Sequence, residues 1–260
     1  MAMVLSYSFC NVSVMPIRKE PMHRSEQVSQ LLFGEKAEVL EMNENEWAKI
    51  RVAWDNYEGW CKVSQLAIVE KKEYNKQRKY MVGRNTDKIV FESSEMWLPL
   101  GADLLRSKVV IGTQTGKFKG KKLEVNKLEA TANAIAENAL IYMNAPYQWG
   151  GRSSAGIDCS GLTQMCSKIC NRKLSRDASQ QAMEGEVVDF LQHGQRGDLA
   201  FFDNAEGKIN HVGILLDNQS IIHATDAAGR VVIDKIDQGG IISTLLRRRT
   251  HSLRMVRRYF

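Results

Sequence analysis

Near residue 127 the hydrophobic pattern of this 260-residue chain changes its period. Upstream, apolar and polar residues alternate over short runs bounded by turn residues, which is typical of β-strands. From Lys127 to Met143 apolar residues recur on one helical face, and a second helix is predicted from Cys159 to Cys170. Helices followed by an antiparallel sheet predict an α+β domain over residues 127–260. Its strands are expected at 199–202, 211–216, 220–225 and 230–235.

The first 69 residues predict a small β-barrel. Several strand patterns fall within this short length, which favours a closed barrel over an open sheet. Asp55-Asn56 supplies a turn signal between two of them. The expected strands are 38–42, 47–52 and 59–63.

A second boundary is expected where the sequence becomes highly charged, at residues 70–79. Strand patterns return over residues 81–125, most clearly at 109–112 and 121–125. We therefore predict three domains: residues 1–69, a second and divergent barrel or linker domain over 70–126, and the α+β domain.

The composition is that of a globular protein, with 43% hydrophobic and 25% charged residues. No apolar run is long enough to span a bilayer, and Met1–Cys10 is interpreted as a first strand and not as a signal peptide. Five cysteines form no recognisable disulfide framework, and Cys166 and Cys170 lack a second ligand pair for zinc. These features favour a cytoplasmic protein, or a periplasmic or extracellular one if a leader precedes this chain.

The net charge of +6 comes largely from arginines near the C-terminus. One interpretation is a solvated basic face, and the other is attraction to an anionic partner. No nucleic-acid recognition motif accompanies the charge, so no nucleic-acid partner is expected. The arginines are Arg247, Arg248, Arg249, Arg254, Arg257 and Arg258.

Cys159 is a candidate nucleophile because of its place in the predicted elements. Asp158 is a favourable N-cap residue, so Cys159 would begin a helix whose unpaired amides and dipole stabilise a thiolate. The Gly150-Gly151 turn precedes it. A buried structural cysteine explains the local sequence equally well.

His211 strengthens the case, since it opens an apolar strand and can accept the proton of Cys159 as a general base. The turn at Asp217-Asn218 predicts a hairpin centred on residue 217, which would place His223 directly opposite His211. Such partners have Cβ atoms roughly 4.5–5.5 Å apart, so one ring would orient the other. Tyr147, twelve residues before the cysteine, is a candidate hydrogen-bond donor to a developing oxyanion.

Together these segments resemble the NlpC-type family of cell-wall cysteine peptidases, which have a circularly permuted papain-like fold. The resemblance implies that Cys159 is the nucleophile, His211 the general base and His223 the orienting residue, with Tyr147 at the oxyanion. It implies no cofactor and no metal. The matching segments are Pro146-Tyr147-Gln148-Trp149-Gly150-Gly151, Asp158-Cys159-Ser160-Gly161-Leu162, Arg196-Gly197-Asp198-Leu199, His211-Val212-Gly213-Ile214 and Ile222-His223-Ala224.

The N-terminal segment resembles the bacterial SH3-like domains that accompany such enzymes, through Gly34-Glu35, Trp47 and Tyr57-Glu58-Gly59-Trp60. This order of domains resembles the YkfC type of the family. The resemblance implies cleavage of the γ-D-glutamyl bond to diaminopimelate or lysine in peptidoglycan stem peptides, during cell-wall turnover or recycling. It also implies a preference for a free N-terminal L-Ala, and we expect a monomer.

A free ammonium calls for a carboxylate, and by the resemblance Asp177 is the main candidate. A helix N-cap explains Asp177 equally well, and Ala178 stands where the family would lead us to expect a serine. Ser160 and Asp158 are expected to be substrate-binding residues, with Ser160 at the D-Glu carboxylate. Tyr57 is expected to close the amine pocket, and Glu26 or Glu20 to add another carboxylate.

Two other functions remain open at this point. One is a peptidoglycan-binding module with an inactive peptidase-like domain. The other is a wall amidase or acyl transferase that uses the same catalytic residues, because one thiolate and one imidazole serve many acyl transfers.

Overall fold

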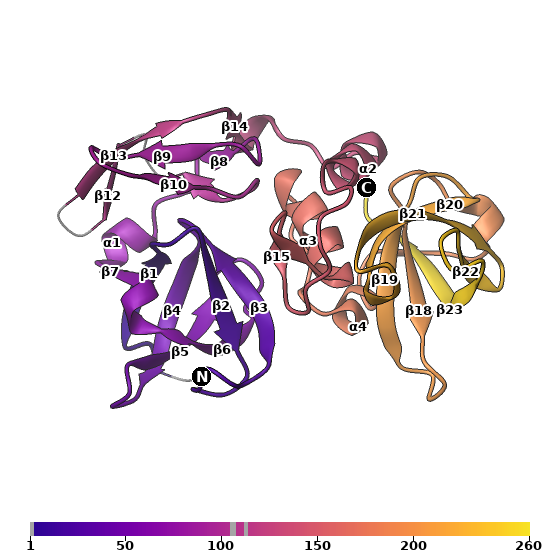
Figure 1. Cartoon of the computed structure of the whole chain (residues 1–260), viewed down its shortest axis with the longest axis horizontal. Coiled ribbons are helices and arrows are strands. Elements are labelled where there is room, and N and C mark those ends of the chain that lie inside the picture. Colours follow the sequence, from indigo (N-terminus) through magenta and orange to yellow (C-terminus); the bar gives the residue numbers. More distant parts are fainter. Residues whose placement is uncertain (1–2, 105–107, 112–113) are drawn as a thin grey trace. The chain divides into compact units, whose positions relative to one another are not determined.

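The computed structural model describes residues 3–104, 108–111 and 114–260. The chain divides into two compact units, Met1–Leu128 and Glu129–Phe260, and each is described by itself (Figure 1). No helix among the described residues is long and apolar enough to cross a membrane.

The N-terminal unit begins with a seven-stranded antiparallel sheet in the order β3-β2-β6-β5-β4-β1-β7. Strand β4 alternates half-buried and buried residues, as a strand with one face on a core must. The core includes Met15, Ile17, Leu31 and Ile50, all fully buried. The strands are β1 Ser6–Cys10, β2 Val14–Arg18, β3 Gln27–Leu32, β4 Lys36–Met42, β5 Trp47–Val52, β6 Glu58–Lys62 and β7 Leu66–Val69, and β7 follows the 3-10 turn η1 Val63–Gln65.

The rest of this unit contains two small sheets, in the orders β10-β9-β13-β12 and β11-β8-β14. The strand expected at 109–112 is β12, which begins one residue earlier, and Gly112 lies outside the described residues. Whether this segment is a second SH3-like barrel stays a prediction. Its elements are α1 Lys71–Tyr74, β8 Tyr80–Val82, β9 Lys88–Val90, β10 Glu95–Trp97, β11 Asp103–Leu104, β12 Lys108–Ile111, β13 Gln114–Lys119, β14 Lys122–Glu124 and η2 Val125–Lys127.

The C-terminal unit packs helices against a seven-stranded sheet in the order β17-β23-β18-β19-β20-β21-β22. Because β22 also pairs with β23, six of these strands form a closed barrel. Its core includes Ala200, Phe202, Leu215 and Ile241. The strands are β15 Arg152–Ser153, β16 Gly156–Ile157, β17 Glu186–Val188, β18 Leu199–Asp203, β19 Ile209–Leu215, β20 Ser220–Thr225, β21 Arg230–Asp237, β22 Gly240–Ser243 and β23 Arg248–Arg258, with the 3-10 turns η3 Leu191–His193 and η4 Asp226–Ala228.

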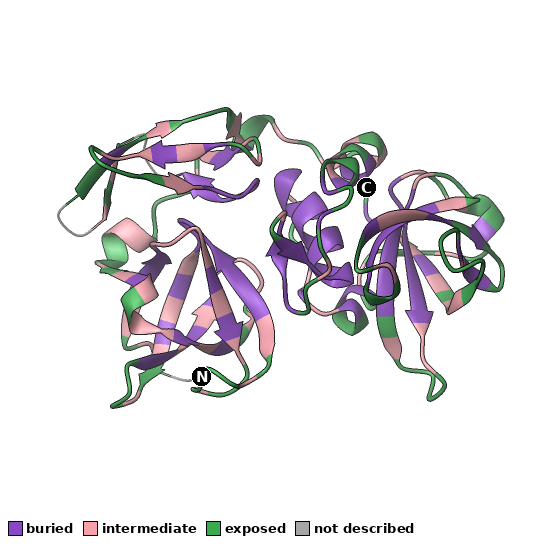
Figure 2. Ribbon diagram, viewed as in Figure 1, coloured by how far each residue is buried: buried purple, intermediate pink, exposed green. Residues whose placement is uncertain are grey.

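The helices of this unit are α2 Ala132–Ile141, α3 Cys159–Ile169 and α4 Ala178–Gln181. Every residue of α3 is buried, because the helix packs against α2 on one side and against β19 and β20 on another (Figure 2). Helix α2 is shorter than the helix predicted from the apolar pattern over Lys127 to Met143. Two residues of that pattern are also more exposed than a buried face would be: Leu140 is 38% exposed and Met143 is 37% exposed. The α+β architecture is therefore confirmed, with the barrel as its sheet.

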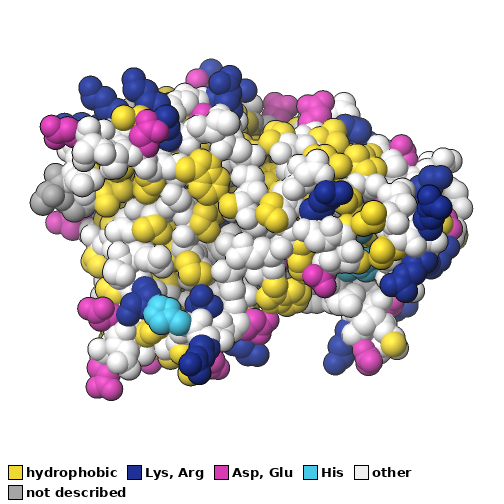
Figure 3. Space-filling view, viewed as in Figure 1, with side chains coloured by type: hydrophobic (Ala, Val, Ile, Leu, Met, Phe, Trp, Pro, Cys, Tyr) yellow, Lys and Arg dark blue, Asp and Glu magenta, His cyan; other side chains and the backbone are white. Residues whose placement is uncertain are grey.

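Strand β23 was not predicted, because its arginines were interpreted as a basic face. Residues 251–255 alternate between half-buried and exposed positions, and Val256 is buried in the core. Among the described residues, three of the arginines form ion pairs: Arg249 with Asp237, Arg254 with Asp203 and Arg258 with Asp198. Figure 3 shows Lys and Arg side chains gathered along the outer edge of the C-terminal unit.

Candidate active site

Cys159 is the first residue of α3, and Asp158 is its N-cap, as predicted. The Asp158 carboxylate accepts a hydrogen bond from the Gly161 amide at 2.6 Å and another from the Gly150 amide at 2.7 Å. Gly161 has no room for a side chain, since an added Cβ would lie 2.1 Å from the Gly151 carbonyl oxygen. The start of the helix is thus held tightly against the turn before it.

A buried ion pair between Asp158 and Arg176 also holds the start of α3 in place. Both Asp158 oxygens accept from Arg176, at 3.1 Å and 2.6 Å, and Arg176 also donates to Ser160 Oγ at 2.7 Å. Arg176 is 2% exposed and Asp158 is 5% exposed. The two predicted substrate-binding residues, Asp158 and Ser160, therefore lie in one network whose geometry fixes the nucleophile helix, and their contact with substrate stays a prediction.

The sulfur of Cys159 lies against β19, where the backbone amide of Val212 hydrogen-bonds to it. Burial, and next the charge of Asp158, raise the pKa of the Cys159 thiol to about 12. Burial and the Asp158 carboxylate thus oppose the thiolate that the helix N-terminus was expected to stabilise, whereas the Val212 amide and Arg176 favour it. The predicted reaction therefore includes a base that takes the thiol proton.

The predicted base, His211, is the residue next to Val212. His211 Nε2 lies 2.8 Å from His223 Nδ1, and both rings are buried. Burial, followed by His251 and His223, lowers the pKa of His211 well below its usual value, so its ring is neutral and able to accept a proton. His223 continues the chain, with its Nε2 lying 3.2 Å from Asp234 Oδ2.

The hairpin register differs from the prediction by one step. Ile214 pairs with Ile222 and Leu215 with Ile221, so the hairpin is centred on residue 218 and not 217. His223 then faces Gly213, whose missing Cβ leaves space beside His223 Cβ. The two histidines are diagonal neighbours, and their rings still meet because imidazoles reach across such a diagonal.

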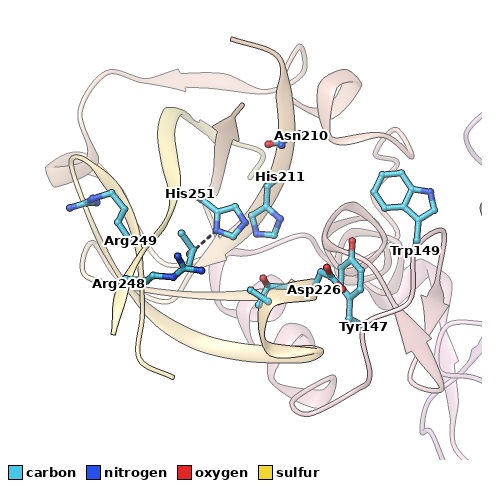
Figure 4. A pocket seen from close by; sticks show the side chains of 11 residues that line it. Tyr147, Trp149, Asn210, His211, Asp226, Arg248, Arg249 and His251 are labelled. Carbon is cyan, nitrogen blue, oxygen red and sulfur yellow. Dashed lines mark hydrogen bonds between the residues drawn. The ribbon is translucent and has the colours of Figure 1, made fainter. Parts of the chain in front are cut away.

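A cavity of about 540 Å³ opens beside His211 (Figure 4). Tyr147 and Trp149 lie on one side of it, and His211 and His251 lie on the barrel side. Tyr147 is held by its backbone amide, which donates to the Gly229 carbonyl at 2.8 Å. Burial, then the charges of Cys159 and Asp158, raise the pKa of Tyr147, so its hydroxyl remains a donor.

His251 was not predicted as part of this site. Its ring stacks on that of His211, with centroids 4.0 Å apart and planes 20° apart, and its Nδ1 lies 2.9 Å from Thr250 Oγ1. The sequence pattern of β23 could have indicated it, because His251 falls at the same alternate, half-buried positions as Leu253 and Met255.

Three histidine nitrogens, from His211, His223 and His251, lie within 4.8 Å of one another. Ligand lone pairs lie in the planes of the imidazole rings and must converge on a tetrahedral ion. Because the His211 and His251 rings are stacked, their lone pairs lie in two nearly parallel planes and do not converge on one point. The two rings therefore suit a packed pair better than a shared metal.

Acidification is expected to destabilise the protein. Burial, followed by His223, lowers the pKa of His251 to about 4, whereas an unfolded histidine titrates near 6.5. The unfolded chain therefore binds more protons between these values, and stability falls as the pH drops from about 6.5 to 4. Urea unfolding at pH 7.5, 5.5 and 4.5 measures the loss. His251→Phe keeps an aromatic ring and should reduce the slope, and an unchanged slope would contradict this origin.

The amine-binding candidates are divided between the two units. Asp177 is half-buried and begins α4, where its side chain and that of Gln180 form a capping box. Tyr57 packs against the core of the first barrel. Glu26 is exposed and lies 3.9 Å from Lys19, and Glu20 is exposed on the same loop. Their roles toward substrate stay predictions.

Comparison with known proteins gives matches for both units. The profile of the NlpC/P60 family matches residues 144–250, and that of the bacterial dipeptidyl-peptidase Sh3 domain matches residues 17–66. A gamma-D-glutamyl-L-lysine dipeptidyl-peptidase of Bacillus subtilis is 29% identical over 75% of this chain and 71% of its own length. Dipeptidyl-peptidase 6 of Lysinibacillus sphaericus is 26% identical over 84% and 88%.

A solved structure has a fold similar to that of this chain. The crystal structure of an NlpC/P60 family protein from Bacillus cereus superposes with a TM-score of 0.81, covering 98% of this chain and 99% of the other. The two sequences are 21% identical, so this match supports the fold alone.

Proposed function

Because this chain is a cysteine peptidase whose NlpC/P60 domain follows a bacterial SH3 domain, we propose that it hydrolyses the γ-D-glutamyl bond to a diamino acid in peptidoglycan stem peptides. The chain of contacts from Cys159 through Val212 and His211 to His223 carries the proposal. It provides a thiol and a neutral base at one point of a buried site.

In the first step the Cys159 sulfur attacks the γ-carbonyl carbon of D-Glu while its proton passes to His211. The carbonyl oxygen becomes an oxyanion, which the Cys159 amide and the Tyr147 hydroxyl stabilise by donating to it. His211 then gives the proton to the departing amine, and the C–N bond breaks to leave a thioester on Cys159.

In the second step water attacks the thioester, with His211 again taking a proton. The C–S bond breaks, the thiol regains its proton, and the L-Ala-D-Glu product leaves with a free γ-carboxylate. Ser160 binds the α-carboxylate of D-Glu in this arrangement, and Asp177 binds the free ammonium of L-Ala.

The cavity beside His211 supports a diamino acid as the leaving group. Since His211 protonates the leaving amine, that group must lie next to its ring. The cavity carries charges of both signs there, Asp226 and Arg248, and neither has an ion-pair partner among the described residues. A carboxylate and a guanidinium complement the ammonium and carboxylate of diaminopimelate or lysine.

Mixing the protein with L-Ala-γ-D-Glu-diaminopimelate is expected to release L-Ala-D-Glu, followed by mass spectrometry. Asp177→Asn keeps an N-cap residue but removes the charge, so KM for this substrate should rise about tenfold. KM for the N-acetylated peptide should not change, because that peptide has no ammonium.

Asp189→Asn, at an exposed carboxylate of the same unit, is the matched control and should change neither KM. Absence of product after full reduction of the thiol would defeat the proposed function. An unchanged preference of Asp177→Asn for free amines would remove Asp177 from the specificity argument and leave the reaction itself intact.

A further inference from the structure

We propose that Asp234 is a positioning residue that sets which nitrogens of His211 and His223 carry protons, an inference that rests on the proposed function. Asp234 lies on β21 and is 3% exposed, and His223 beside it on β20 is fully buried. Asp234 is not among the site residues predicted from the sequence.

The hydrogen bonds of Asp234 define its state. Its Oδ1 accepts from the Thr244 amide at 2.7 Å and from Thr244 Oγ1 at 2.8 Å, and its Oδ2 lies 3.2 Å from His223 Nε2. Burial opposes ionisation, but the hydrogen bonds from His223 and Thr244 hold the pKa of Asp234 below its usual value. A carboxylate only accepts, so His223 must donate to it from Nε2.

The proton on His223 Nε2 determines where the protons lie on the nitrogens of His223 and His211. A neutral His223 with its proton on Nε2 has a lone pair on Nδ1, which then accepts from His211 Nε2 at 2.8 Å. His211 is left with a lone pair on Nδ1, the nitrogen that takes the thiol proton. If His223 carried its proton on Nδ1 instead, His211 would accept at Nε2 and hold its own proton on Nδ1, and it would be unable to act as a base there.

Asp234 also supplies charge to the buried pair. When His211 becomes an imidazolium it must overcome burial and two neighbouring rings, which lower its pKa. No lysine or arginine pairs with Asp234 among the described residues, so its negative charge acts on the histidines. The proton on His211 is therefore stabilised through His223 while the thioester forms.

A purely structural role is the competing explanation, because Asp234 ties β21 to Thr244 after β22. Thr244→Val is the matched control. It removes the hydroxyl donor to Asp234 but keeps the backbone amide, the carboxylate and the His223 contact.

Two measurements test the inference, and neither the NMR spectrum nor the alkylation rate needs a peptide. The first is ¹⁵N NMR of the histidine rings in the wild-type protein, which should show the proton on Nε2 in both His211 and His223. A proton on Nδ1 of either ring would overturn the proposal, and this result does not depend on any variant folding.

The second measurement is the rate of Cys159 alkylation by iodoacetamide as a function of pH, located by mass spectrometry. Asp234→Asn should slow alkylation and kcat by about 10- to 100-fold with little change in KM, and Thr244→Val, which keeps the carboxylate and its backbone donor, should lose much less. Equal rates for Asp234→Asn and wild type, or an equal loss in Thr244→Val, would overturn the proposal. Normal labelling without cleavage of the γ-D-glutamyl peptide would instead defeat the proposed function.

Discussion

Replacing Cys159 with alanine is expected to lower kcat for the γ-D-glutamyl peptide by about 10⁴-fold or more, because no other group can form the thioester. The helix should still begin at this position, since the cap comes from Asp158 and not from the sulfur. Circular dichroism and urea unfolding should therefore remain close to those of the wild type, and the loss is read from product release by mass spectrometry.

Cys166 and Cys170 provide matched controls, because both are buried in or at the end of the same helix. Cys166→Ala and Cys170→Ala remove a thiol without touching the base and should keep kcat within a few-fold. Activity of Cys159→Ala above about one hundredth of the wild-type value would mean that another residue attacks the carbonyl.

Breaking the ion pair behind the nucleophile should have the largest effect on stability. Arg176→Met leaves the Asp158 carboxylate buried without its cation, which costs about 3–5 kcal/mol in the free energy of unfolding. The loss also frees the start of α3, so kcat should fall with stability. Urea unfolding of the full chain measures the first effect, and the peptide assay at low temperature measures the second.

A double variant separates charge from packing. Asp158→Asn combined with Arg176→Met removes both charges and keeps an N-cap side chain, so it should be more stable than Arg176→Met alone. Arg254→Met is the control at an exposed arginine, 3.9 Å from Asp203, and should change stability by less than about 0.5 kcal/mol. A double variant no more stable than the single one would show that the buried charge is not the cause.

The start of the helix at Cys159 could be predicted from the sequence because a few adjacent residues decide it. Aspartate favours the N-cap position of a helix, and the helix that follows Asp158 ends within one residue of its predicted end. The pKa of the thiol could not be predicted in the same way. It depends on burial by β19 and on the orientation of Asp158, and both arise only when distant segments pack.

Contacts between strands also could not be predicted fully from the sequence. The position of the hairpin turn was nearly right, yet one residue in its centre decides which side chains face each other. Strand β23 was missed because its arginines were counted as charge, although residues 251–255 alternate between half-buried and exposed positions. Asp234 carried a readable signal, since it interrupts an apolar alternation with Val232 and Ile236, but its partner could not be named from sequence.

The closure of the barrel by β22 and β23 has a consequence for how such a peptidase diversifies. His211, His223 and Asp234 stand on three successive strands, and β20 pairs with β21 along its whole length. Residues at the cavity rim, such as Asp226 in η4 and Arg248 at the start of β23, lie at strand ends. Substitutions there can change the preferred leaving group without disturbing the pairing of the strands that carry the three buried side chains.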